Sequence, residues 1–104
     1  MAFTDTPTDW FPSWAEDGTD ITVPIASFTG LTAATADAAT GDIRKILYSI
    51  LDTAWGKWAS LAAADRSAQM VLRKESFTQS DGTIKHTFIT EFVTAASGQA
   101  VVDE

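Results

Sequence analysis

The sequence predicts an α+β protein, in which an extended N-terminal arm precedes one long amphipathic helix (plus a short preceding helix) packed on a C-terminal antiparallel β-hairpin. Three patterns support this fold: a start rich in acids and prolines, apolar residues at helical spacing, and two β-prone runs around an Asp-Gly turn. The 104 residues are enough for one small domain, and 45% hydrophobic residues are typical of a globular chain. We expect the arm over residues 1–28 and a helix-plus-hairpin domain over residues 29–104.

The N-terminal arm concentrates negative charge and aromatic side chains. Residues 1–43 contain seven acids and no lysine or arginine, whereas residues 44–104 contain seven acids and seven bases, so the net charge of −7 belongs to the first part. Prolines and a glycine argue against regular secondary structure in residues 1–20. Disordered tails are usually poor in aromatic residues, but this stretch holds four: Phe3, Trp10, Phe11 and Trp14. We therefore expect these side chains to be buried against a surface.

Two short elements are expected before the long helix. The segment from Ile21 to Ile25 has the composition of an extended stretch, and Pro24 confines it to a sheet edge or to a position outside a sheet. The alanine- and threonine-rich residues that follow predict a short helix over Ala33 to Ala39, with Thr32 as its N-cap. Gly41 then breaks or bends the chain.

The long helix has the clearest pattern in the sequence. Its apolar residues recur as on one face of a helix, and we call them the apolar stripe: Ile43, Ile46, Leu47, Ile50, Leu51, Ala54 and Trp58. Trp55 and Leu61 widen this stripe. Polar residues fall largely elsewhere on the helical wheel: Arg44, Lys45, Ser49, Asp52 and Lys57. We expect Thr40 to cap the helix, Asp42 to favour its first turn through the helix dipole, and the helix to end near Ala62.

The C-terminal part predicts a β-hairpin from residues 70–79 and 84–93. Asp81-Gly82 as a two-residue loop is a strong type I′ hairpin signal. That loop would produce three cross-strand pairs: Phe77 with His86, Glu75 with Phe88, and Val71 with Phe92. A three-residue loop with a bulge would shift every partner by one residue, and the sequence leaves both registers open.

The fold as predicted leaves apolar surface without a partner in the monomer. A lone hairpin is marginally stable in water, and one helix can cover only one of its faces. Ala100, Val101 and Val102 are expected to add a short third strand. We expect a homo-oligomer, with the arm reaching onto a neighbouring subunit or another protein. The expected interface residues are Phe3, Trp10, Phe11, Trp14, Ile21, Val23, Ile25, Trp55 and Trp58.

No motif in the sequence indicates catalysis, a cofactor or a metal. The chain has no cysteine, and none of the common phosphate-binding, nucleophile-elbow or zinc-protease motifs occurs. His86 is the only histidine; Glu75 or Glu91 could reach it, but a half-exposed strand residue is the expected role. The acids of residues 16–20 lack the spacing of a calcium loop and predict a solvated turn. We expect a non-enzymatic protein.

The charge distribution limits the partners. Nucleic acid and anionic membranes require a basic patch, which the arm lacks, whereas a basic protein surface would suit it. The acids could equally serve only to keep the segment soluble.

No basic start followed by an apolar run marks a signal peptide, and no apolar stretch is long enough to span a bilayer, so synthesis in the cytoplasm is expected. Trp10 and Trp14 could anchor an interface, pack within their own chain, or stack on a sugar as in a carbohydrate-binding host-attachment module.

Two segments carry a resemblance to a group of viral proteins. Residues 9–25 (DWFPSWAEDGTDITVPI) and 40–45 (TGDIRK) resemble small proteins encoded among the structural genes of tailed bacteriophages, cyanophages included. The resemblance implies a virion component, most closely a capsid decoration (cement) protein, with a tail, baseplate or fibre-associated protein as the alternative. It also implies symmetric oligomers, trimers above all, that clamp their neighbours with extended arms. It carries over no functional residue.

Overall fold

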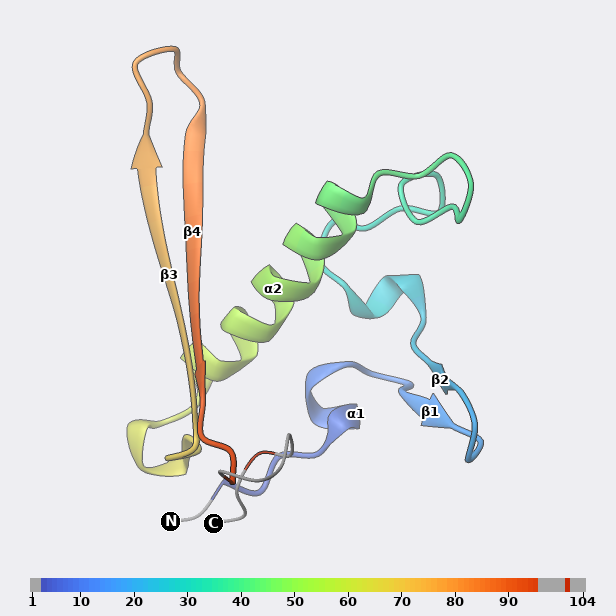
Figure 1. Ribbon diagram of the computed structural model, residues 1–104, viewed down its shortest axis with the longest axis vertical. Helices are drawn as coiled ribbons and strands as arrows, with labels where there is room; N and C mark the ends of the chain where they lie inside the picture. Colours follow the sequence, from blue (N-terminus) through green and yellow to red (C-terminus); the bar gives the residue numbers. More distant parts are fainter. Residues whose placement is uncertain (1–2, 96–100, 102–104) are drawn as a thin grey trace. The chain divides into compact units, whose positions relative to one another are not determined.

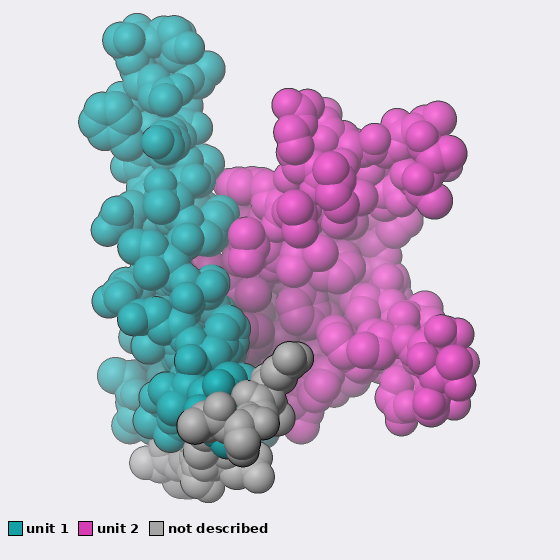
Figure 2. All heavy atoms as spheres, viewed as in Figure 1, with its two compact units in different colours: residues 1–4, 58–104 teal, residues 5–57 magenta. Residues whose placement is uncertain are grey.

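The computed structural model describes residues 3–95 and residue 101, and it confirms the mixed α+β organisation. Along the chain, the described residues form a short helix and a small hairpin, then one long helix, then a long C-terminal hairpin (Figure 1). The chain groups into two compact units: unit 2 is residues 5–57, and unit 1 is residues 1–4 with 58–104 (Figure 2). The expected division after residue 28 stays a prediction, because compactness alone does not decide which parts fold independently.

The expectation that residues 1–20 lack regular structure is wrong. Helix α1 (Pro7–Trp10) begins with a proline, which fits the first helical position because its missing N–H would be unpaired there anyway. The Asp9 carboxylate turns back and accepts the backbone N–H of Thr6 (2.7 Å), which closes the helix start. The proline that argued against a helix is therefore part of its first turn.

A small hairpin follows α1. Strands β1 (Ala15–Glu16) and β2 (Ile21–Thr22) pair antiparallel, and Gly18 adopts the left-handed conformation in their loop (φ 89°). The extended start expected at Ile21 is therefore confirmed. Pro24 lies outside the ladder and precedes the 3-10 helix η1 (Ile25–Ser27), as its missing N–H requires.

The short helix predicted over residues 33–39 is wrong; the segment forms successive turns. Short polar side chains compete there with helical hydrogen bonding. The Thr35 hydroxyl donates to the Thr32 carbonyl (3.0 Å), and one Asp37 carboxylate oxygen accepts the N–H groups of Ala39 and Thr40 (2.9 Å each). These bonds hold the backbone in turns where alanine content alone predicts a helix.

Helix α2 (Ile43–Ser60) is the predicted long helix, and it ends within two residues of the expected position. Its cap is different from the expected one. Asp42 precedes the first turn and accepts the Arg44 N–H (2.9 Å), whereas Thr40 donates its hydroxyl to Asp37 (3.0 Å). The expected packing of α2 on the C-terminal hairpin stays a prediction.

The C-terminal hairpin consists of β3 (Met70–Thr78) and β4 (Ile84–Phe92). The 3-10 helix η2 (Ala63–Asp65) lies between α2 and β3 in the chain. The two-residue-loop register is wrong, and the alternative register, shifted by one, is confirmed: Phe77 faces Lys85 and Ser76 faces His86. Gln79 donates its N–H to the Thr83 carbonyl (2.7 Å), which leaves three residues in the loop. Gly82, at φ 88°, occupies the left-handed position that such a loop requires.

The register decides which side chains share a face of the hairpin. Since paired residues lie on the same face, the even-numbered residues of both strands form one face and the odd-numbered residues the other. The even face contains Met70, Leu72, Ile84, Phe88 and Phe92. The odd face carries most of the charges, namely Arg73, Glu75, Lys85 and Glu91, whereas Lys74 lies on the even face opposite Phe88. Beyond β4, Val101 bridges Thr94, while Ala100 and Val102 of the expected third strand lie outside the described residues.

Candidate functional site

Trp10, the first expected interface anchor, is buried within its own chain. Only 9% of its surface is exposed, and its indole N–H donates to the Asp5 carboxylate (2.8 Å). A buried tryptophan normally needs such an acceptor, and Asp5 lies only five residues before it in the chain. Packing within the chain therefore accounts for Trp10 in this conformation.

The other aromatic residues of the arm form a cluster within unit 2. The Phe11 ring lies 5.3 Å from the Phe28 ring and 5.9 Å from the Trp14 ring, both tilted, as aromatic pairs prefer. The Ser27 hydroxyl donates to the Pro12 carbonyl and joins the same two segments. Residues 10–14 thus pack against residues 27–28, and the arm folds back on itself.

The remaining interface candidates of the arm differ in exposure. Ile21 is 64% exposed and Ile25 is 39% exposed, whereas Val23 and Phe3 are half-buried. Ile21 is therefore the expected interface residue of the arm that is most available to a partner.

Two expected interface residues lie on α2, and both Trp55 and Trp58 are half-buried. The Arg66 guanidinium lies 4.1 Å from the Trp58 ring centroid and donates to the carbonyls of Trp58 and Ala59 (3.1 Å each), so it closes the end of the helix. The Trp58 indole N–H is buried without an acceptor among the described residues. Arg66 therefore contacts the face of the Trp58 ring and not the indole nitrogen of Trp58.

The buried positions of α2 are two hydroxyl residues that the helical wheel did not select. Ser49 is 2% exposed and Thr53 is 6% exposed. The Ser49 hydroxyl donates to the Thr29 carbonyl, the Thr53 hydroxyl accepts the Thr29 N–H (2.9 Å), and the same hydroxyl donates to the Ser49 carbonyl (2.7 Å). Both the N–H and the C=O group of Thr29 are therefore hydrogen-bonded to α2. The only sequence signal was a pair of hydroxyl residues one turn apart.

The first residues of the apolar stripe are exposed to solvent. Ile43 is 63% exposed and Leu47 is 53% exposed, while the later members of the stripe are half-buried. By helical spacing, Ser49 and Thr53, which bind Thr29, lie beside the stripe rather than at its centre. An apolar surface at the first two turns of α2 is left to solvent.

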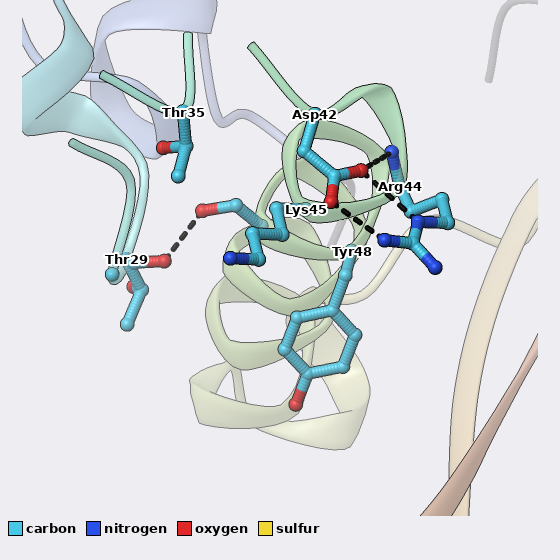
Figure 3. Close-up of a pocket in the computed structure, with 8 residues that line it drawn as sticks. Thr29, Thr35, Asp42, Arg44, Lys45 and Tyr48 are labelled. Carbon is cyan, nitrogen blue, oxygen red and sulfur yellow. Dashed lines mark hydrogen bonds and ion pairs between the residues drawn. The ribbon is translucent and has the colours of Figure 1, made fainter. Parts of the chain in front are cut away.

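One pocket of about 360 Å³ lies in unit 2 beside the start of α2. Its lining joins the loop after η1 to the first turns of the helix: Thr29, Gly30, Thr35, Asp42, Arg44, Lys45, Tyr48 and Ser49. In Figure 3 the Lys45 side chain extends toward the side of Thr29, while Arg44 turns to Asp42. The lining offers hydroxyl groups, the Lys45 ammonium and the carboxylate of Asp42, which is bound to Arg44.

Asp42 carries the strongest electrostatic perturbation of the pocket. The Arg44 side chain binds its carboxylate through Nε (3.1 Å) and Nη2 (2.8 Å). This interaction, aided by the Arg44 backbone N–H, lowers the pKa of Asp42 from 3.8 to about 2. Asp42 is therefore ionised at neutral pH, where its charge suits the helix N-terminus.

Most acids of residues 1–43 stabilise local backbone structure. Asp17 accepts the N–H groups of Thr19 (2.9 Å) and Asp20 (2.7 Å), and Glu16 accepts that of Gly18 (2.6 Å). The backbone donors lower the pKa of Asp17, and similar bonds from residues 39 and 40 lower the pKa of Asp37. The acidic turn at residues 16–20 is thus a set of carboxylates that bind their own loop.

His86 makes a different contact from the one expected. Its Nδ1 lies 2.7 Å from the Ser76 hydroxyl across the hairpin, on the even face. Glu75 and Glu91, the acids that could have oriented it, belong to the odd face. Neither glutamate therefore lies on the face of the hairpin that holds the Ser76–His86 pair.

Within residues 3–95 and 101, no group of three or more histidine, cysteine or acidic side chains is placed to hold a metal ion. None of the helices described is both long and apolar enough to cross a membrane.

No model of a known protein family, no curated protein and no solved structure matches the chain significantly.

Proposed function

We propose that this protein is a non-enzymatic structural component of a phage virion, most closely a capsid decoration protein that binds a larger structural protein and copies of itself. The observation that carries the proposal is the amount of exposed apolar surface. Among the described residues only Trp10 and Leu72 are nearly fully buried hydrophobic side chains, whereas eleven large ones are 37–69% exposed. Exposed large apolar side chains can form the surface through which a subunit binds another protein.

The phage setting rests on the resemblance of residues 9–25 and 40–45 to small proteins encoded among tailed-phage structural genes. The charge of unit 2, with eight acids and three bases, suits a basic patch on the partner. A tail, baseplate or fibre-associated role uses the same features and is the second candidate. Burial of the Trp10 ring removes one of the two stacking surfaces that favoured a carbohydrate-binding module.

The test is incorporation into particles made in cells that express the chain with the genes beside it. The tagged protein should purify with the particles at a fixed ratio to the major structural protein. Its absence from intact particles would rule out the proposed function.

A point substitution tests the role of the arm better than a deletion, since removing residues 1–20 would also remove the buried Trp10. Ile21→Asp places a charge on the most exposed apolar residue of the arm and should reduce incorporation severalfold. Thr22→Asp, on the same strand and also exposed, is the matched control and should be incorporated normally. Equal incorporation of both variants would exclude Ile21 from the docking surface.

A further inference from the structure

The outer edge of β4 is long and regular up to Phe92, and just beyond the strand Val101 bridges Thr94. The nine residues of β4 exceed the five or six of a typical strand, and β3 is the only strand paired with it among the described residues (Figure 1). A long open edge is a template for pairing with another strand, and natural proteins usually protect it or use it.

The hydrogen bonds of the hairpin establish which residues face that edge. Gln69 with Val93 and Gln79 with Thr83 are hydrogen-bonded pairs, so the odd residues of β4 direct their N–H and C=O groups to β3. The even residues, from Ile84 to Phe92, therefore direct theirs to the outer edge. An antiparallel partner can form a regular ladder with these positions.

The sequence of β4 is complementary to itself about Phe88. When two copies of the strand are aligned antiparallel with Phe88 opposite Phe88, all nine residues find a partner. Lys85 then lies opposite Glu91 of the other copy, and Ile84 lies opposite Phe92. Each of these pairings occurs twice because the arrangement has two-fold symmetry, and opposite charges and apolar pairs are the cross-strand combinations that stabilise a sheet.

The exposure of these residues fits such a pairing. Ile84 is 55% exposed and Phe92 is 52% exposed, although both are large and apolar. The Glu91 side chain already binds Arg73 (2.7 Å) but remains 57% exposed, so its carboxylate can accept a second cation.

The edge of β3 is a poorer match to itself. Aligned about its central residue, β3 places Arg73 opposite Glu75, which is favourable, but it also places Lys74 opposite Lys74 at the two-fold axis. Like charges directly opposite one another destabilise a strand pair. The β4 edge has an aromatic residue at the corresponding position.

We propose that two copies of this chain join through their β4 strands, antiparallel and centred on Phe88, into a continuous four-stranded sheet. The inference rests on the proposed function in that it names how copies of the assembly subunit meet. Such an interface is isologous and closes at a dimer, so it differs from the trimer that the resemblance implies.

Charge reversal tests the pairing between copies. Lys85→Glu or Glu91→Lys alone places like charges opposite each other twice per dimer and should weaken the dimer about tenfold. The double variant restores opposite charges and should recover the wild-type dissociation constant. Within one chain the two residues are about 20 Å apart along the strand, beyond the screening length of about 8 Å, so recovery requires contact between copies.

Sedimentation equilibrium measures the dimer fraction, and Lys45→Glu, outside the hairpin, is the control for a change of net charge. If the double variant forms a dimer no tighter than that of the weaker-dimerising single variant, the proposal is overturned.

Cysteine cross-linking fixes the register, because the wild-type chain has no cysteine and any disulfide of a single-cysteine variant joins two copies. Phe88→Cys should form a disulfide dimer, since Cα atoms of a hydrogen-bonded antiparallel pair are about 5.5 Å apart, within the range a disulfide spans. His86→Cys is the matched control and should not cross-link, because its copy lies about 13 Å away in this register.

Cross-linking of Lys74→Cys but not of Phe88→Cys would overturn the proposal in favour of the β3 edge. Failure to cross-link by a chain that still purifies with particles would reject the β4 pairing and leave the proposed function standing. The reverse result, a cross-linked dimer absent from particles, would reject the function and support the pairing.

Discussion

Individual carboxylates in unit 2 accept hydrogen bonds from the backbone near them. Much of the negative charge of unit 2 therefore stabilises local structure. Asp9, Asp17, Asp37 and Asp42 each bind backbone N–H groups within three residues. Residue composition predicted an acidic segment that is either soluble or able to dock on a partner. It could not predict these hydrogen bonds, because the sequence does not show whether a carboxylate bends back to a nearby backbone N–H or points into solvent.

Replacing Arg44 should raise the pKa of Asp42. In Arg44→Gln the guanidinium that lowers this pKa to about 2 is gone, so NMR titration of the Asp42 carboxyl should give a value nearer 3.8. An unchanged pKa in the variant would contradict the ion pair.

The sign of the pH effect follows from the same interaction. Because the pKa of Asp42 is lower in the folded chain, its contribution to stability is complete above the unfolded value of 3.8 and is lost as the pH falls toward 2. The stability difference between wild type and Asp42→Asn, measured by urea unfolding of the helix signal, should therefore shrink between about pH 5 and pH 2. A constant difference over that range would exclude a charge-dependent cap.

Gly41 and Gly56 provide a matched pair of glycine substitutions. A Cβ at Gly41 would lie 2.5 Å from the Asp37 carbonyl oxygen, so Gly41→Ala should destabilise unit 2 by forcing the turn open. Gly56 lies inside α2 with open space around it, so Gly56→Ala should stabilise the helix by about 1 kcal/mol. Thermal unfolding distinguishes the two, and equal effects would contradict the close approach at Gly41.

At the scale of elements, the sequence predicted the long helix and the C-terminal hairpin because both follow local periodicity. It missed α1, because a proline ends most helices but fits the first helical turn, and it predicted a helix at residues 33–39 where threonine and aspartate side chains hold turns. The hairpin register depended on whether Ser80 belongs to the loop, which the Asp-Gly signal alone cannot decide.

The seam between α2 and residue 29 is the element-scale feature that the sequence could not supply. It pairs positions 20 and 24 residues apart through hydroxyls that a helical wheel assigns to the polar side. The pocket shares this origin, since it too forms where residues 29–35 meet the start of α2.

Thr53→Val tests the seam with an almost unchanged shape. The valine cannot accept the Thr29 N–H, and the loss of a partner for a part-buried donor should cost about 1–3 kcal/mol in the free energy of unfolding. Thr87→Val, at an exposed strand position, is the control and should change this free energy little. Equal stability of both variants would show that the seam contributes nothing.

At the scale of the whole molecule, apolar side chains remain exposed in both units: Ile21, Ile43 and Leu47 in unit 2, and Phe77, Ile84 and Phe92 in unit 1. The sequence predicted this excess from the small size of the core and the width of the apolar stripe. It did not predict the place of self-association, which depends on the strand register and on which residues of β4 face its open edge.

The mass of the purified chain in solution tests this account most directly. Sedimentation equilibrium over a range of concentrations should reveal a species heavier than the 11.2 kDa monomer, increasing with concentration and reduced by Lys85→Glu. A chain that stays at the monomer mass at every concentration would contradict self-association as the use of its exposed apolar surface.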